Sequence, residues 1–120
     1  LLTEHVFGIS LKLFLQPYYE GQASMSDVHA FLEQRGFRLF GMESQSWPRG
    51  LVGAHDRKQW VGKGQVMWSE MIYLKDYVGL LASGRSDYRT FGKAKVLRMV
   101  TLAEIHGFED FALELLEGVS

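Results

Sequence analysis

The residue most suggestive of chemistry in this sequence is Glu70, a carboxylate inside an otherwise apolar run at 66–74. Burying a carboxylate is costly unless it is paired with a cation or faces a cavity. Carboxylates in such surroundings are also common at functional sites. Two interpretations stay open: Glu70 faces a ligand cavity, or it points to solvent from a strand that is buried on one face only.

Metal binding and nucleophilic catalysis have weak support. The histidines lack the i,i+4 spacing of a helical metal pair, so we interpret them as isolated polar residues. They are His5, His29, His55 and His106. The chain has no cysteine, which excludes disulfides, thiolate ligands and cysteine nucleophiles. A Ser-His-Asp triad stays open because such triads assemble in space, although no G-x-S-x-G elbow is present.

Cofactor motifs are absent from the sequence: it contains neither G-x-G-x-x-G nor a phosphate-binding P-loop. The nearest candidate, Gly62-Lys63-Gly64, precedes a strand instead of opening a helix, so we predict a turn there. The surrounding segment 45–65 is basic and contains two tryptophans, a composition that can bind single-stranded nucleic acid or a phosphorylated ligand. Its charge excess is small and the net charge of the chain is −1, so we favour a solvated loop and expect no nucleic-acid partner.

The composition is that of a globular protein. The chain has 120 residues, of which 47% are hydrophobic and 22% charged. No apolar run approaches the roughly 20 residues of a membrane span, and no basic segment of a signal peptide precedes one. We therefore expect a soluble, cytoplasmic protein with no membrane partner. The first residue is Leu1, so a fragment or a processed product is expected.

The alternation of apolar residues predicts a first strand over 7–15, which Pro17 ends because proline cannot donate to a sheet. One face of this strand is apolar. It consists of Phe7, Ile9, Leu11, Leu13 and Leu15.

A helix is predicted over 25–35. Ser24, with Asp27 three residues later, resembles a capping box, and Gly36 stands where a helix-ending glycine belongs. A second strand follows at 37–43. Because a helix separates the two strands, we expect a parallel, right-handed β-α-β unit.

The rest of the chain is predicted to begin with a long loop at 44–65. A third strand follows at 66–74, and since no helix precedes it we expect it to run antiparallel to the second strand. A helix is predicted at 86–105, started by Ser86-Asp87. After Gly107 a second helix is predicted, whose apolar face includes Phe108 and Phe111.

Three motifs, in this order, resemble the FkbM-type S-adenosylmethionine-dependent methyltransferases. They are Pro17-Tyr18-Tyr19-Glu20-Gly21-Gln22, then Arg35-Gly36-Phe37-Arg38-Leu39 after a helix, then Trp68-Ser69-Glu70-Met71-Ile72-Tyr73. The resemblance covers roughly residues 7–75. This sequence departs from the family's pattern at Lys12, where an acidic residue is common, and at Tyr18, where leucine is expected. The tail after residue 76 matches nothing in the family.

The resemblance implies a fold. Methyltransferases of this class have a seven-stranded sheet whose last strand is antiparallel, and the three predicted strands correspond to its fifth, sixth and seventh. The strand at 66–74 should then lie between the other two. The expected fold class is α/β: residues 1–76 form a β-α-β unit plus an antiparallel third strand, as at the end of a class I methyltransferase sheet. Residues 77–120 form a helical extension.

The resemblance also implies a function. The glycine-rich cofactor loop and the ribose-binding acid belong to the half of the family's domain that these residues do not match. We therefore expect S-adenosylmethionine to serve the intact enzyme and not to bind this chain alone. Ligands bind beyond the carboxyl ends of parallel strands, so the segment after the first strand should line a pocket for a small-molecule acceptor in O-methyl transfer. The candidate substrate-binding residues are Tyr18, Tyr19, Glu20 and Gln22, with Glu70 as a further candidate.

We expect a protein partner docked on the edge of the 7–15 strand, because unpaired strand edges recruit other chains. This partner is either the missing N-terminal, cofactor-binding half or a second copy of this chain. The helical tail offers an alternative cover for the same strand. The alternative function is a non-catalytic interaction or oligomerisation module.

Overall fold

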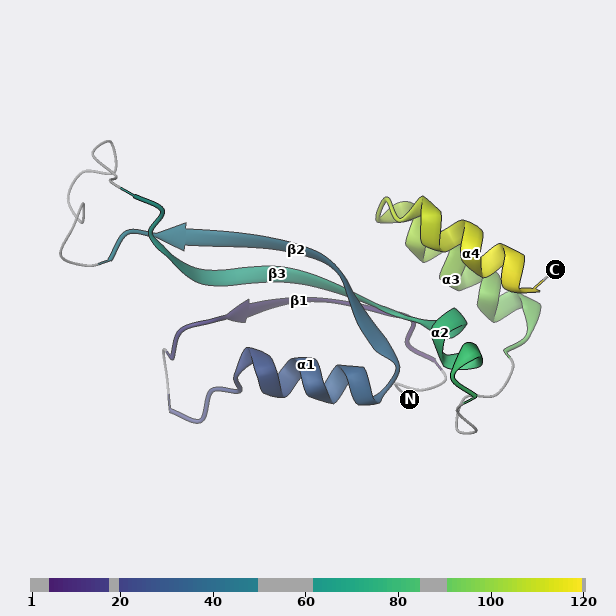
Figure 1. Cartoon of the computed structure of the whole chain (residues 1–120), viewed down its shortest axis with the longest axis horizontal. Coiled ribbons are helices and arrows are strands. Elements are labelled where there is room, and N and C mark those ends of the chain that lie inside the picture. Colours follow the sequence, from purple (N-terminus) through teal and green to yellow (C-terminus); the bar gives the residue numbers. More distant parts are fainter. Residues whose placement is uncertain (1–4, 18–19, 50–61, 85–90, 120) are drawn as a thin grey trace.

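The computed structural model describes residues 5–17, 20–49, 62–84 and 91–119. Its strands, within these residues, are β1 (Gly8–Phe14), β2 (Phe37–Trp47) and β3 (Gln65–Lys75), in the order β1-β3-β2. β3 is antiparallel to both neighbours, so β1 and β2 run parallel to each other on either side of it (Figure 1). The predicted position and direction of the third strand are confirmed.

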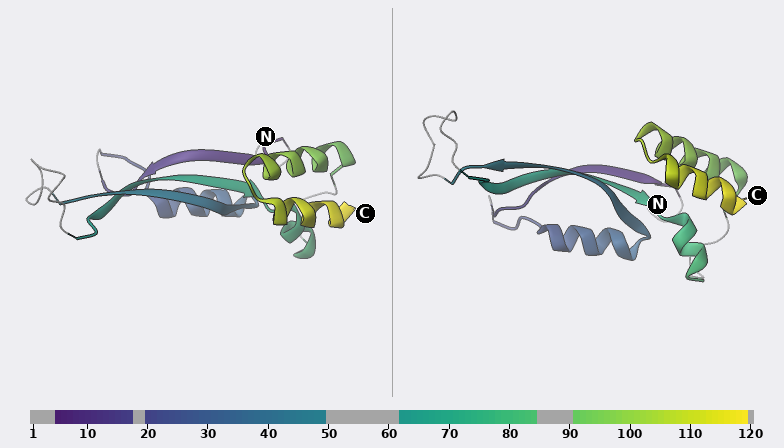
Figure 2. Two further views of the ribbon diagram at one scale, coloured as in Figure 1. Left: turned by 90° about the horizontal axis from the view of Figure 1, so that it is seen from above. Right: turned by 45° about the horizontal axis from the view of Figure 1, so that its top comes forward.

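Helix α1 (Met25–Gln34) covers one face of this sheet (Figure 2). It starts as predicted, since the Ser24 hydroxyl accepts a hydrogen bond from the Asp27 amide at 3.1 Å. It ends before Gly36, whose φ of 86° favours glycine. Beneath α1 lies an apolar cluster whose buried members are Leu32, Phe37, Met71 and Tyr73.

The apolar face of the first strand is confirmed except at its start. Ile9, Leu11, Leu13 and Leu15 pack in the cluster beneath α1. Phe7 does not, because its ring packs edge-on against Phe91 in the helical tail, with 6.1 Å between ring centroids.

Strand β2 continues to Trp47, four residues beyond the predicted end. The loop predicted at 44–65 therefore begins four residues too early. In the sheet, the Ser69 hydroxyl donates to the Glu43 carbonyl at 3.1 Å, and its oxygen lies 3.2 Å from the Ser44 hydroxyl. Pairing with β3, which is not visible in local composition, therefore extends the strand.

The tail contains helices α2 (Tyr77–Ala82), α3 (Lys93–Ile105) and α4 (Glu109–Val119). They lie at the end of the sheet where β3 leaves it (Figure 1). Their apolar cluster includes residues of the sheet: Leu74 is buried in it, while Phe40 and Ile72 pack against it. Leu39 packs beneath α1 and Phe40 faces this cluster, as alternation along a strand requires. The irregularity in the β2 pairing comes next and places Gly41 opposite Ile72.

The predicted helix at 86–105 is confirmed from Lys93 onward as α3. Its predicted start, Ser86-Asp87, lies outside the described residues, and Phe91 and Gly92 are not helical. Phe91 explains the late start, because its amide donates to the Tyr77 hydroxyl at 2.7 Å and its ring stacks on the Tyr77 ring. These contacts hold the chain against α2 immediately before the helix begins.

Candidate functional site

The turn that follows β1 is shaped by Gln22. Its side-chain amide donates to the carbonyls of Phe14, at 3.2 Å, and Gln16, at 2.9 Å. The neighbouring Gly21 has a φ of 78°, a conformation that favours glycine. The Gly21-Gln22 part of the motif therefore closes the turn, and the side-chain amide of Gln22 faces the backbone of the strand.

The other predicted residues of this turn are placed only in part. Tyr18 and Tyr19 lie outside the described residues. Glu20 is described and exposed. It belongs to the segment between β1 and α1, which lies at the end of the sheet toward which β1 and β2 run (Figure 1). Its carboxylate is thus accessible to a ligand beyond the carboxyl ends of the parallel strands.

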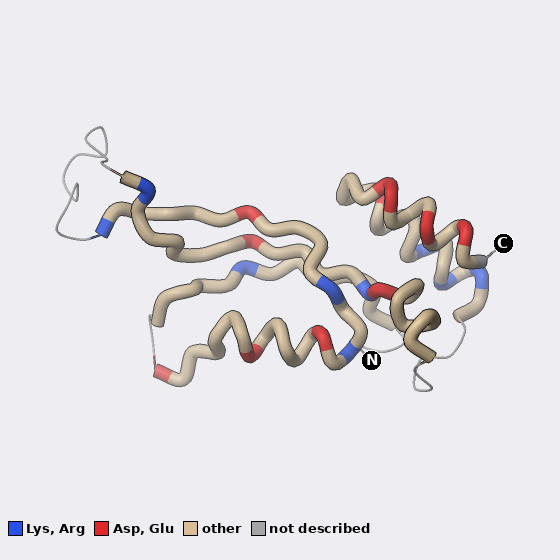
Figure 3. The backbone as a smooth tube through the Cα atoms, in the orientation of Figure 1, with Lys and Arg blue, Asp and Glu red and all other residues tan. Residues whose placement is uncertain are grey.

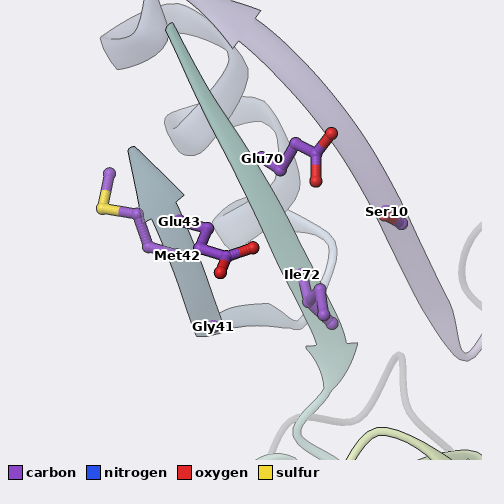
Figure 4. A pocket seen from close by; sticks show the side chains of 6 residues that line it. All are labelled: Ser10, Gly41, Met42, Glu43, Glu70 and Ile72. Carbon is purple, nitrogen blue, oxygen red and sulfur yellow. The ribbon is translucent and has the colours of Figure 1, made fainter. Parts of the chain in front are cut away.

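Glu70 lies elsewhere, in a shallow hollow in the middle of the sheet. The hollow has a volume of about 210 Å³. It is on the face opposite α1, because the residue after Glu70, Met71, is buried beneath that helix. It is lined by Ser10, Gly41, Met42, Glu43, Glu70 and Ile72 (Figure 4). Glu70 is exposed, so this carboxylate lines an open surface and is not buried in an apolar strand.

Glu43 is the residue that sequence reasoning missed. It pairs directly with Glu70 across β2 and β3, so two carboxylates lie side by side, and such like-charge pairs are destabilising. Figure 3 shows these acidic positions next to each other, with a basic position on β1. Strict alternation from Leu39, which packs beneath α1, would put Glu43 on the α1 face. The register shift between Leu39 and Gly41 moves it to the face of Glu70, so the alternation of the predicted strand points away from this pair.

Lys12 does not neutralise the pair. Lys12 is the residue of β1 that pairs with Glu70, so β3 has Lys12 on one neighbouring strand and Glu43 on the other. The Nζ of Lys12, however, lies over the Trp68 ring, 3.8 Å from the ring centroid. This is a cation-π contact. The hollow therefore presents two carboxylates without an ion pair among the described residues.

Glu70 and the turn are too far apart to share one small pocket. Glu70 pairs with Lys12, and the turn begins after Gln16, four residues further along. At about 3.3 Å per residue, the separation is about 13 Å. The structure thus separates the predicted site residues into two groups.

A second pair of polar groups lies on the α1 face. His29 Nδ1 is 2.9 Å from the Tyr73 hydroxyl, and His29 Nε2 is 3.6 Å from Glu33. Burial, and secondly the Glu33 carboxylate, raise the pKa of Tyr73 above 10.0. Tyr73 is therefore protonated at neutral pH. The interpretation of His29 as an isolated polar residue is wrong, because its ring contacts the Tyr73 hydroxyl.

The described residues were also compared with the requirements of a metal site, a membrane span and a nucleic-acid-binding segment. Among the described residues, no group of three or more His, Asp or Glu could hold a metal ion. No helix in the same ranges is long and apolar enough to cross a membrane. Most of the basic segment lies outside the described residues; within them, Arg49 donates to the Gln65 side chain at 2.8 Å and Trp47 is half exposed.

Comparisons with protein-family models, curated proteins and solved structures found no significant match to this chain.

Proposed function

We propose that this chain is the C-terminal, acceptor-side part of an S-adenosylmethionine-dependent O-methyltransferase of the FkbM type, and that it is not catalytic alone. The observation that carries the proposal is the strand order β1-β3-β2 with an antiparallel strand in the centre. The motif resemblance predicted this order. A sheet in which the last strand inserts between two parallel strands supports a class I methyltransferase sheet end.

The proposed acceptor site is the turn after β1. Gln22 and Gly21 hold its backbone, which leaves Glu20 and the two tyrosines before it as the side chains that contact the acceptor. Methyl transfer requires orientation of the acceptor hydroxyl and, for a poor nucleophile, removal of its proton. Glu70 is assigned no part in this pocket, because about 13 Å of strand separates it from the turn.

The extended shape of the chain is consistent with a missing partner. The radius of gyration is 18.4 Å. A compact domain of this length has about 14 Å. Among the described elements, no helix lies over the charged middle of the sheet face opposite α1 (Figure 2). A cofactor-binding half would cover such a surface.

Calorimetric titration with S-adenosylmethionine tests the proposal. The polypeptide encoded by the natural reading frame around these residues should bind one equivalent, and the chain of residues 1–120 should bind none. One-to-one binding by the isolated chain at micromolar affinity would refute the assignment. So would a reading frame that lacks a glycine-rich strand-loop-helix.

The acceptor site is tested separately, in the same longer polypeptide. A panel of hydroxylated small molecules should reveal acceptors by release of S-adenosylhomocysteine. Glu20→Gln should lower kcat/KM for the acceptor without changing cofactor affinity. The matched control is Glu104→Gln on α3, which should leave both quantities unchanged.

An interaction module is the second candidate. The observation in its favour is the outer edge of β1, which pairs with no strand among the described residues. Of its outward-facing backbone carbonyls, that of Phe14 is covered by the Gln22 side chain. A reading frame without a cofactor-binding half would favour this candidate.

A further inference from the structure

An imidazole and a carboxylate lie side by side on α1. His29 and Glu33 are four residues apart, so their side chains project from the same side of the helix. The two side chains are 36% and 48% exposed, so both are accessible to an ion from solvent. The spacing of a helical metal pair, which the histidines lack among themselves, therefore exists between a histidine and a glutamate.

The distance between the two groups is close to the distance that a shared metal ion requires. His29 Nε2 lies 3.6 Å from the Glu33 carboxylate, which is too long for a hydrogen bond. Zinc binds histidine nitrogen and carboxylate oxygen at about 2.0–2.2 Å, so two ligand atoms at the tetrahedral angle are about 3.4 Å apart. A small rotation of either side chain would let one zinc ion contact both atoms.

The other ring nitrogen of His29 has a supporting partner. Its Nδ1 lies 2.9 Å from the hydroxyl of Tyr73, whose side chain is fully buried beneath α1. Metal binding through Nε2 requires the hydrogen on Nδ1, which then donates to the Tyr73 oxygen. Tyr73 can accept this bond because its own hydrogen has an acceptor in Met71 Sδ, at 3.9 Å. Such a second hydrogen bond fixes the orientation of a metal-binding imidazole.

No arginine occupies the place of the metal ion. Arg35 and Arg38 are close to Glu33 in the sequence, but their guanidinium groups donate to main-chain carbonyls. Among the described residues, His29 is the only ion-pair partner of the Glu33 carboxylate. This carboxylate is therefore available to a cation.

We propose that His29 Nε2 and the Glu33 carboxylate bind one zinc ion, with Tyr73 as the residue that positions the imidazole. Water completes the coordination. Two protein ligands are fewer than the three of catalytic zinc sites or the four of structural sites, so we expect weak and exchangeable binding. The inference does not depend on the proposed function, since neither ligand belongs to the turn after β1.

Calorimetric titration of the untagged chain with zinc chloride, in a buffer without chelators, tests the site. The wild-type chain should bind one equivalent. His29→Gln and Glu33→Gln should each weaken binding by more than the roughly 10-fold that the loss of a supporting residue costs. The matched controls are His106→Gln and Glu104→Gln, at exposed positions on or beside α3, which should bind as wild type does. A wild-type chain that binds no zinc, or four variants that bind equally, would overturn the proposal.

Two further measurements separate the site from a folding defect. Zinc should raise the thermal denaturation midpoint of the wild-type chain and not that of Glu33→Gln, whose substituted side chain is about half exposed and leaves the core intact. In nitrogen-15 spectra of the imidazole, zinc should shift the Nε2 signal of His29 and leave Nδ1 protonated. Coordination through Nδ1, or an equal rise in the midpoint of both chains, would contradict the site.

Tyr73→Phe tests the positioning role. It removes the acceptor of the Nδ1 hydrogen and keeps both zinc ligands, so zinc affinity should fall about 10-fold. Unchanged affinity would show that Tyr73 does not orient the imidazole for the metal ion.

Discussion

Two regions of the molecule bury their apolar residues in different ways: the sheet together with α1, and the helical tail. The sheet buries one face under a single helix and leaves charged residues in the middle of the other. The tail forms a cluster of its own and borrows residues from the sheet. The two clusters meet at β3, where the consecutive residues Tyr73 and Leu74 face opposite sides. One strand thus serves two cores, which predicts that the two regions stabilise each other.

Phe111→Ala is the strongest test of this mutual dependence. Phe111 is buried in the tail cluster, and its ring lies 4.7 Å from that of Phe40 on β2. Truncating a buried phenylalanine costs about 3–5 kcal/mol. We expect that loss in the free energy of unfolding, measured by denaturant titration. The matched control is Leu113→Ala on the exposed side of the same helix, which should change it by less than about 0.5 kcal/mol.

Amide exchange in Phe111→Ala shows how far the damage spreads. If β3 couples the two regions, amides of α1 and α4 should lose protection together. Unchanged protection of α1 would mean that the sheet and the tail unfold separately. In that case β3 would contribute residues to both clusters without coupling their stability, contrary to our expectation.

The contrast between the regions also explains what the sequence could predict. The α1 region follows local signals: the Ser24 cap, Gly36 and the alternation of β1 predicted elements that the structure confirms. In the tail, Gly107 and the apolar spacing after it predicted a helix that α4 confirms. The start of α3 does not follow from local signals, because α3 begins where Phe91 contacts Tyr77, a residue on another helix. β2 was predicted too short for the same reason, since Ser44 is held by Ser69.

The candidate site shows the same limit. The motif pointed to the turn after β1, but the role of Gln22 depends on carbonyls that only the folded strand presents. For Glu70 the sequence left a ligand cavity and solvent as alternatives, and the structure places it, exposed, in an open hollow. Its neighbour Glu43 follows from register and not from spacing. Local patterns therefore identified single residues, and the pairing of strands decided which of them lie together.

Gln22→Ala tests the structural role of the motif. Removing both hydrogen bonds of the side-chain amide should cost about 1–2 kcal/mol. The expected result is a lower denaturation midpoint with unchanged cooperativity. Glu20→Ala, two residues away and exposed, is the matched control and should leave the midpoint unchanged. If both variants behave alike, Gln22 does not hold the turn.

Tyr73→Phe gives a smaller effect that depends on pH. Loss of the contact with His29 should cost about 1 kcal/mol at neutral pH. Because the folded pKa of Tyr73 is raised above 10.0, the folded state holds this proton more tightly than the unfolded state. Its stabilisation is present below pH 10.0 and is lost as the pH rises through the folded pKa, by at most about 1.4 kcal/mol per pH unit.

The measurement is the difference in unfolding free energy between wild type and Tyr73→Phe across the alkaline range. Taking the difference removes the contributions of the other tyrosines and the lysines. The wild-type advantage should shrink above pH 10.0. Parallel curves would show that the Tyr73 hydroxyl titrates equally in both states.

The smallest expected effect concerns the outer edge of β1, where amide exchange rates test whether the outward-pointing amides are unpaired. The Lys75 amide donates to the Phe7 carbonyl, and the Leu15 amide donates to the Met67 carbonyl. Since bonded residues alternate in an antiparallel ladder, the odd-numbered residues of β1 bond to β3, and the amides of Ser10 and Lys12 point outward. In a dilute sample these two amides should exchange quickly, while those of Leu11 and Leu13 should be protected.

A strand added to this edge would protect the amides of Ser10 and Lys12, whether it comes from a second copy or from a cofactor-binding half. Exchange measured at rising concentration therefore tests whether a second copy docks on this edge. If Ser10 and Lys12 are already protected in the dilute monomer, the edge is covered within the chain, and partner docking on β1 is excluded.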